Sequence, residues 1–123
     1  DYISLNCDLN PSSRHLMNER TLSFMRSNAV LINTARGPIV DEPALISALE
    51  AGSIRGAALD VFEVEPLSGD SPLLKMPNVL LGSHNSNSSP MAWERVHLNT
   101  IGNLLVGLEI PCPDLEEIRQ STR

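Results

Sequence analysis

The chain has 123 residues, enough for one domain with a buried core. Its 41% hydrophobic and 20% charged residues are typical of a globular protein, and no apolar run is long enough to cross a bilayer. The net charge of −6 and the scattered positions of the nine Lys and Arg residues argue against a nucleic-acid partner. Composition therefore favours a small molecule or a protein as partner.

The two cysteines, Cys7 and Cys112, lie far apart in the sequence. Their spacing predicts neither a disulfide framework nor a metal site, and it fits a reducing, cytoplasmic setting. No signal peptide can be identified at the N-terminus. Because the chain begins with Asp1 rather than Met, we expect that an N-terminal part is missing.

The first third of the sequence predicts two strands separated by a short helix. Residues 2–7 alternate apolar with small polar side chains and precede the turn-forming residues 10–13, which predicts a strand and a loop. Asn18 can cap a short helix that runs through Met25. Residues 29–33 form an apolar run rich in β-branched side chains, typical of a strand buried on both faces.

The remaining elements continue the alternation of helix and strand. Asp41 can cap a helix that ends at Gly52, and the runs 54–61 and 78–81 predict two further strands. Ser89 can cap a long last helix that carries an apolar stripe at helical spacing. Strands that alternate with helices predict the α/β class, with a Rossmann-like parallel sheet flanked by helices.

In such sheets ligands bind beyond the carboxyl ends of the strands, so the residues after each strand are the candidates for function. Each of them also has an ordinary explanation. Arg36 could be a surface charge, and Asp60 could cap a backbone group. Glu65 could belong to a solvated acidic turn and His84 to a polar loop. Cys7 is most simply a small buried side chain.

Taken together, the ordered motifs favour a functional explanation of these residues over the ordinary ones. They closely resemble the C-terminal signature of the D-isomer-specific 2-hydroxyacid dehydrogenases, a family that includes phosphoglycerate, glyoxylate and hydroxypyruvate dehydrogenases. The resemblance covers roughly residues 1–108. It is specific for the family and not for the substrate. The motifs are NTARGPIVDE at 33–42, GAALDVFEVEP at 56–66, SPLL at 71–74, PNVL at 77–80, and His84.

The resemblance assigns three catalytic groups. It implies that Arg36 binds the carboxylate and carbonyl of a small 2-keto or 2-hydroxy acid, a role that suits a planar guanidinium. It implies that His84 is the general acid/base and that Glu65 holds it. A carboxylate beside an imidazole favours the protonated ring, which can donate a proton.

The resemblance also implies NAD as cofactor, with NADP not excluded, and no metal. It implies that residues 1–110 form the C-terminal part of an NAD(P)-binding domain and that residues 111–123 form a polar tail. The expected cofactor-binding positions are Cys7, Thr34, Ala35, Arg36, Asp60, His84, Asn85 and Ser86.

Two features depart from the family pattern. The dinucleotide motif GxGxxG is absent from the sequence, so we expect the chain alone to bind cofactor poorly. The loop around His84, residues 82–89, is more polar than the glycine-rich loop usual in the family. We therefore expect either a homo-oligomer or a missing N-terminal part that completes the site.

Two alternatives to an enzyme stay open at this point. Some relatives of the family are cofactor-sensing corepressors without catalysis, and they also keep the trio of Arg36, Glu65 and His84. A stable inactive fragment is the other alternative, because a half-sheet with an open edge tends to self-associate. The sequence does not distinguish the 2-hydroxy acid, NAD from NADP, or the oligomer.

Overall fold

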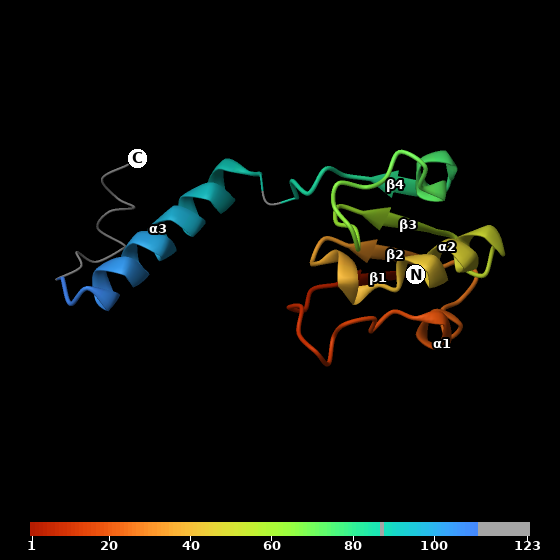
Figure 1. The fold of residues 1–123 in the computed structure, drawn as a ribbon, viewed down its shortest axis with the longest axis horizontal. Coiled ribbons are helices and arrows are strands. Elements are labelled where there is room, and N and C mark those ends of the chain that lie inside the picture. The colour runs from red at the N-terminus through yellow and green to blue at the C-terminus, as the bar shows by residue number, and fades with distance from the viewer. Residues whose placement is uncertain (87, 111–123) are drawn as a thin grey trace. The chain divides into compact units, whose positions relative to one another are not determined.

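The computed structural model describes residues 1–86 and 88–110, and the chain forms two compact units. The first unit, residues 1–86, contains a parallel sheet with short helices (Figure 1). The second unit begins at residue 87, and its described residues contain one long helix. The predicted polar tail, residues 111–123, lies outside the described residues, so the domain boundary at residue 110 stays a prediction.

The sheet has four strands in the order β1-β2-β3-β4, and every neighbouring pair is parallel. In the register, Leu5 lies opposite Asn33, Asn33 opposite Leu59, and Leu59 opposite Leu81. All four strands therefore end at one edge. The α/β class with a parallel sheet is confirmed. The strands are β1 (Tyr2–Leu5), β2 (Val30–Asn33), β3 (Gly56–Leu59) and β4 (Val79–Leu81).

Three α-helices and two short 3₁₀ helices complete the described elements. The α-helices are α1 (Glu19–Leu22), α2 (Glu42–Glu50) and α3 (Pro90–Gly107). The 3₁₀ helices are η1 (Gly37–Ile39), which follows β2, and η2 (Pro72–Lys75), which precedes β4.

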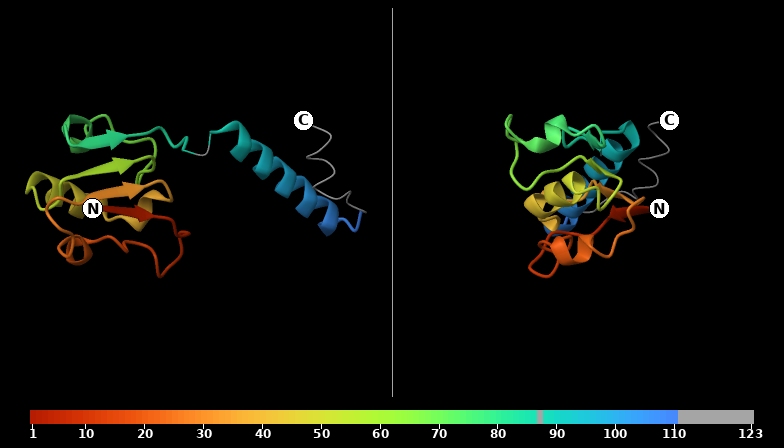
Figure 2. Two further views of the ribbon diagram at one scale, coloured as in Figure 1. Left: turned by 180° about the vertical axis from the view of Figure 1, so that it is seen from behind. Right: turned by 90° about the vertical axis from the view of Figure 1, so that its right-hand side faces the viewer.

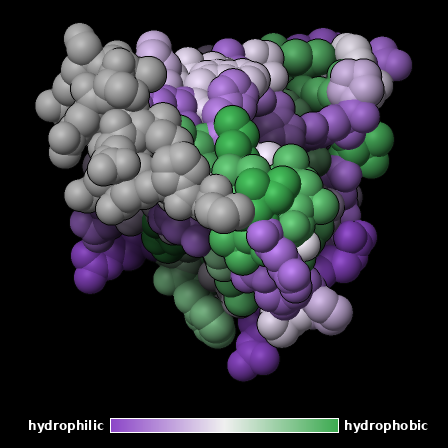
Figure 3. Space-filling view, turned by 90° about the vertical axis from the view of Figure 1, so that its left-hand side faces the viewer, coloured by the Kyte–Doolittle hydropathy of each residue, from purple (hydrophilic) through white to green (hydrophobic). Residues whose placement is uncertain are grey.

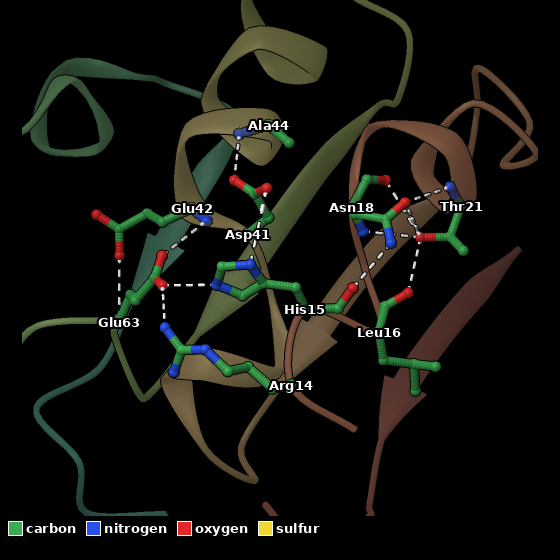
Figure 4. A network of polar contacts seen from close by, with 9 residues as sticks. All are labelled: Arg14, His15, Leu16, Asn18, Thr21, Asp41, Glu42, Ala44 and Glu63. Carbon is green, nitrogen blue, oxygen red and sulfur yellow. Dashed lines mark hydrogen bonds and ion pairs between the residues drawn. The ribbon is translucent and has the colours of Figure 1, made fainter. Parts of the chain in front are cut away.

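Helix α1 begins where predicted and ends earlier. The side chain of Asn18 accepts a hydrogen bond from the Thr21 N–H at 3.2 Å, and the Asn18 N–H donates to the Thr21 hydroxyl at 2.8 Å (Figure 4). This reciprocal pair is a capping box. The helix ends at Leu22 instead of Met25, because the N–H groups of Phe24 and Met25 bond to carbonyls three residues back.

The predicted caps of the two longer helices are confirmed. Oδ1 of Asp41 accepts from the Ala44 N–H at 3.1 Å, and α2 is followed by Gly52 in the left-handed region at φ 63°. Ser89 Oγ accepts from the Ala92 N–H at 3.1 Å at the start of α3. Side-chain acceptors at these positions satisfy N–H groups that have no partner within the helix.

The core lies between one face of the sheet and the helices α1 and α2, which cover that face (Figure 2). Val30 and Ile32 point to the opposite face and are only half-buried, so the prediction that their strand is buried on both faces is wrong for this unit. The largest fully buried side chains are Leu22, Leu31, Ile39, Leu45, Ile54, Leu73 and Asn33.

Apolar side chains also remain at the surface, where hydrophobic and hydrophilic residues lie side by side (Figure 3). On α3 the predicted apolar stripe is present but exposed: Trp93 and Val96 are each 53% exposed and Leu104 is 59% exposed. Within the described part of the chain, no helix is both long and apolar enough to span a membrane.

Candidate active site

The loops after β3 and β4 bring a histidine and a glutamate together at the carboxyl edge of the sheet. His84 lies three residues after β4, and Glu65 lies in the loop after β3. Nδ1 of His84 is 2.7 Å from Oε2 of Glu65. Both side chains remain accessible, with 48% and 35% of their surface exposed. The imidazole is thus held on one nitrogen, while a ligand can approach it.

Glu65 is fixed on its second oxygen as well. Its Oε1 accepts a hydrogen bond from the Phe62 N–H at 2.9 Å, within the same loop. The hydrogen bond with His84 is the main cause that lowers the pKa of Glu65, and the bond from Phe62 adds to it against the opposing effect of partial burial. The carboxyl group is therefore ionised near neutral pH and can stabilise a protonated imidazole.

Asp60 fixes the backbone that follows the histidine. Its Oδ1 accepts from the Asn85 N–H at 3.1 Å and its Oδ2 accepts from the Ser86 N–H at 2.8 Å. Burial by itself raises the pKa of Asp60, but the two N–H donors and the nearby His84 outweigh it, so the pKa lies below its usual value. The backbone-capping explanation of Asp60 is thus observed in the structure.

Two backbone features depend on this arrangement. His84 adopts a left-handed conformation at φ 57°, which non-glycine residues adopt only when their surroundings hold them there. Gly82 lies so close to Asp60 that an added Cβ would collide with its Oδ1. A side chain at position 82 would therefore displace the carboxylate that holds the His84 turn.

Arg36 lies at the same edge of the sheet, after β2, and its side chain is exposed. Asn33 shapes the turn that carries it. The fully buried amide of Asn33 accepts from the Ala35 N–H at 3.1 Å and donates to the Arg36 carbonyl at 3.0 Å. The guanidinium bonds to the carbonyl of Ala35 at 2.7 Å and keeps further N–H donors for a carboxylate. We had not expected this role for Asn33, although an amide inside an apolar strand was a sign of it.

Three cavities follow one another along this edge. The first, of about 580 Å³, lies beside β1 and β2, and the second, of about 250 Å³, lies beside β3 and β4. The third, of about 560 Å³, contains both Glu65 and His84. Thr34 lines the first and second cavities, and Gly82 lines the second and third. Neighbouring cavities in this row therefore share lining residues.

The cavities divide the predicted site residues into two groups. Cys7, Thr34, Ala35 and Arg36 line the first cavity together. Glu65 and His84 share the third, while the N–H groups of Asn85 and Ser86 bind Asp60. Arg36 lines the first cavity and His84 lines the third, so a ligand that contacts both must extend along the row.

The middle cavity is mostly apolar. Ala58, Leu59 and Leu81 line it together with Thr34 and Asp60, and both carboxylate oxygens of Asp60 accept backbone hydrogen bonds. The individual cofactor contacts, including those of Asn85 and Ser86, stay predictions.

A fourth cavity, of about 590 Å³, lies between α1 and α2, away from the strand ends. Alanine, serine and proline side chains make up most of its lining, with two carboxylates, Glu19 and Asp41. It brings together no imidazole, guanidinium or thiol. The cavities that contain a guanidinium and an imidazole are those at the sheet edge.

Comparisons with known proteins show the family to which the chain belongs. Residues 1–86 match the family described as D-isomer specific 2-hydroxyacid dehydrogenase, NAD binding domain. A glyoxylate reductase of Thermofilum pendens is 44% identical over 113 residues, which are 92% of this chain and 33% of the relative. A glyoxylate/hydroxypyruvate reductase B of Klebsiella pneumoniae is 42% identical over 108 residues, or 88% of this chain and 33% of the relative. The chain thus spans about a third of the length of the curated relatives it matches.

Solved structures show the same fold. An acyclic imino acid reductase in complex with NADPH and D-Arg has a TM-score of 0.81 and 37% identity, over 89% of this chain and 34% of that one. A D-isomer specific 2-hydroxyacid dehydrogenase of Xanthobacter autotrophicus, in complex with NADPH and MES, has a TM-score of 0.75 and 38% identity, over 94% and 49%. The chain therefore belongs to the NAD-binding domain family of the D-isomer specific 2-hydroxyacid dehydrogenases.

Proposed function

We propose that this chain supplies the acid–base and carboxylate-binding groups of an NAD(P)-dependent D-2-hydroxyacid dehydrogenase. The observation that carries the proposal is the pairing of His84 Nδ1 with Glu65 at 2.7 Å, at the same sheet edge as the exposed guanidinium of Arg36. The names of the matched relatives support glyoxylate or hydroxypyruvate as the substrate. NAD is the proposed cofactor, with NADP not excluded.

In the reductive direction, the carboxylate of the keto acid binds Arg36, and its keto oxygen accepts a proton from Nε2 of His84. When bound, the reduced nicotinamide supplies the hydride that adds to the keto carbon. Together, hydride and proton convert the C=O group to CH–OH, and His84 then regains its proton from solvent. Glu65 keeps Nδ1 protonated and thereby directs Nε2 to the substrate. Oxidation of the hydroxy acid follows the same steps in reverse.

The non-catalytic, cofactor-sensing module is the less favoured candidate. The matched relatives named above are reductases and a dehydrogenase, and no observation favours the module over them. A homo-oligomer and a cytoplasmic location stay predictions from the sequence.

The test is turnover by the full-length protein with NADH or NADPH and a panel of glyoxylate, hydroxypyruvate and pyruvate. His84→Ala should lower kcat by about 10²- to 10⁴-fold, the usual contribution of a general acid. His97→Ala, which removes an exposed histidine of α3, should leave kcat near the wild-type value. Cofactor binding without turnover of any keto acid would favour the sensing module instead.

A further inference from the structure

A second histidine–carboxylate pair is formed by His15 and Glu63 (Figure 4). Nε2 of His15 is 2.6 Å from Oε1 of Glu63, and Arg14 reaches the same oxygen at 3.4 Å. Oε2 of Glu63 accepts from the Glu42 N–H at 3.3 Å, and the Glu63 N–H donates to Oε2 of Glu42 at 3.2 Å. Glu63 therefore has polar partners on both carboxylate oxygens and on its backbone.

The pair connects three segments that are distant in sequence. His15 lies in the loop before α1 and is 48 residues from Glu63. The backbone of this loop pairs with the segment after Arg36: the His15 N–H donates to the Pro38 carbonyl at 2.9 Å, and Met17 bridges Val40. The third segment is the loop that carries Glu63. One histidine thus joins the loop of Arg36 to the loop of Glu65.

The pair is partly buried. The side chain of Glu63 is 21% exposed and that of His15 is 35% exposed. The other ring nitrogen of His15, Nδ1, faces Asp41 Oδ2 at 3.9 Å. The backbone of His15 adopts φ 51°, a costly conformation that persists only where several contacts hold it.

We propose that His15 and Glu63 are positioning residues that fix the separation between Arg36 and the Glu65–His84 pair. The proposal rests on the function proposed above. A small keto acid has a fixed distance between its carboxylate and its keto oxygen, so the groups that bind the two ends must keep a matching separation. Glu63 is two residues before Glu65, and displacements of about 1 Å can lower turnover severely.

A purely structural role predicts a different result. If the pair only anchored α2, its loss would lower the free energy of unfolding and leave the kinetics of the folded protein unchanged. A positioning role requires instead that the effect on turnover pass through Glu65. Non-additivity between substitutions at positions 63 and 65 therefore separates the two roles.

The kinetic experiment uses Glu63→Gln and His15→Gln in the full-length protein, with Glu50→Gln, an exposed carboxylate of α2, as the matched control. We expect Glu63→Gln to lower kcat about tenfold while the KM for cofactor stays within about twofold. In a Glu65→Gln background the same substitution should lower kcat less than about twofold further. Equal effects in both backgrounds, or an unchanged kcat, would overturn the proposal.

A second measurement does not depend on turnover. The ¹⁵N resonance of His84 Nδ1 reports its hydrogen bond to Glu65, and it should shift in Glu63→Gln and His15→Gln but not in Glu50→Gln. His15→Gln keeps the bonds of Glu63 to Arg14 and Glu42, so it tests the proposal if Glu63→Gln does not fold. An unshifted resonance in a folded variant contradicts the positioning role. Failure of the wild-type protein to reduce any keto acid would contradict the proposed function alone.

Discussion

The imidazole of His84 and the carboxylate of Glu65 meet at 2.7 Å although 19 residues separate them in the sequence. Because this contact occupies Nδ1, the second nitrogen, Nε2, is the one left to exchange a proton with a ligand. The contact also lowers the pKa of the Glu65 carboxyl group.

The lowered pKa of Glu65 predicts a dependence of stability on pH. The hydrogen bond with His84 is its largest cause, so ionised Glu65 stabilises the folded state above the usual pKa of 4.5. This stabilisation should be lost as the pH falls through the lower folded-state pKa. In denaturant unfolding at pH values from about 6 to about 3, the wild type should lose more stability than Glu65→Gln. Parallel curves for the two proteins would contradict the prediction.

Arg36→Lys tests whether substrate binding needs the planar pair of N–H donors of the guanidinium. A lysine keeps the charge but offers a keto acid no planar pair of N–H donors. We expect kcat/KM for glyoxylate to fall about 10- to 100-fold. Arg55→Lys, at an exposed position before β3, is the control and should leave kcat/KM unaltered. Equal kcat/KM in both variants would remove Arg36 from the substrate site.

Asp60→Asn should loosen the loop of His84. The amide oxygen can accept from only one of the two N–H groups, and the amide NH₂ would face the other N–H. We expect the free energy of unfolding to fall by about 1–3 kcal/mol and kcat to fall with it. Asp70→Asn, an exposed carboxylate in the loop before η2, should change neither quantity. An Asp60→Asn protein as stable and active as the wild type would show that the two bonds are not needed.

Gly37→Ala should disturb the packing between the loops of Arg36 and Glu65. A Cβ at position 37 would collide with the Phe62 carbonyl, whereas at Gly69 it would meet no atom within 4 Å. We expect Gly37→Ala to lower the free energy of unfolding by at least about 1–3 kcal/mol, the usual cost of overpacking. Gly69→Ala should be near neutral. Thermal unfolding of the two variants checks this, and equal melting temperatures would contradict it.

Much of the fold could be predicted because its signals are local. The β-branched run at 29–33 predicts β2, and Asn18, Asp41 and Ser89 cap helices where the sequence predicts them. The error at the end of α1 has a local cause as well: the chain tightens into three-residue turns after Leu22. Burial of the second sheet face could not be judged locally, because it depends on what packs there.

The candidate site was only partly predictable. The strand ends indicate the loops that carry Arg36, Glu65 and His84, because parallel strands end at one edge, and the family resemblance singles out these three side chains. The hydrogen bonds from the N–H groups of residues 85 and 86 to Asp60 join positions that are 25 and 26 residues apart. The His15–Glu63 contact spans 48. Such contacts have no periodic or local signal, and only the folded backbone brings their partners together.

The left-handed backbone of His84 also bears on how the protein can be engineered. Glycine, and to a lesser degree asparagine, occupies that conformation at lower cost, so the folded protein gives up some stability to keep an imidazole there. Replacing His84 relieves this backbone cost but removes the hydrogen bond to Glu65, so His84→Asn should change stability less than turnover, and selection for heat resistance alone does not protect the imidazole. A thermostable variant of this domain has to be selected for heat resistance and turnover together.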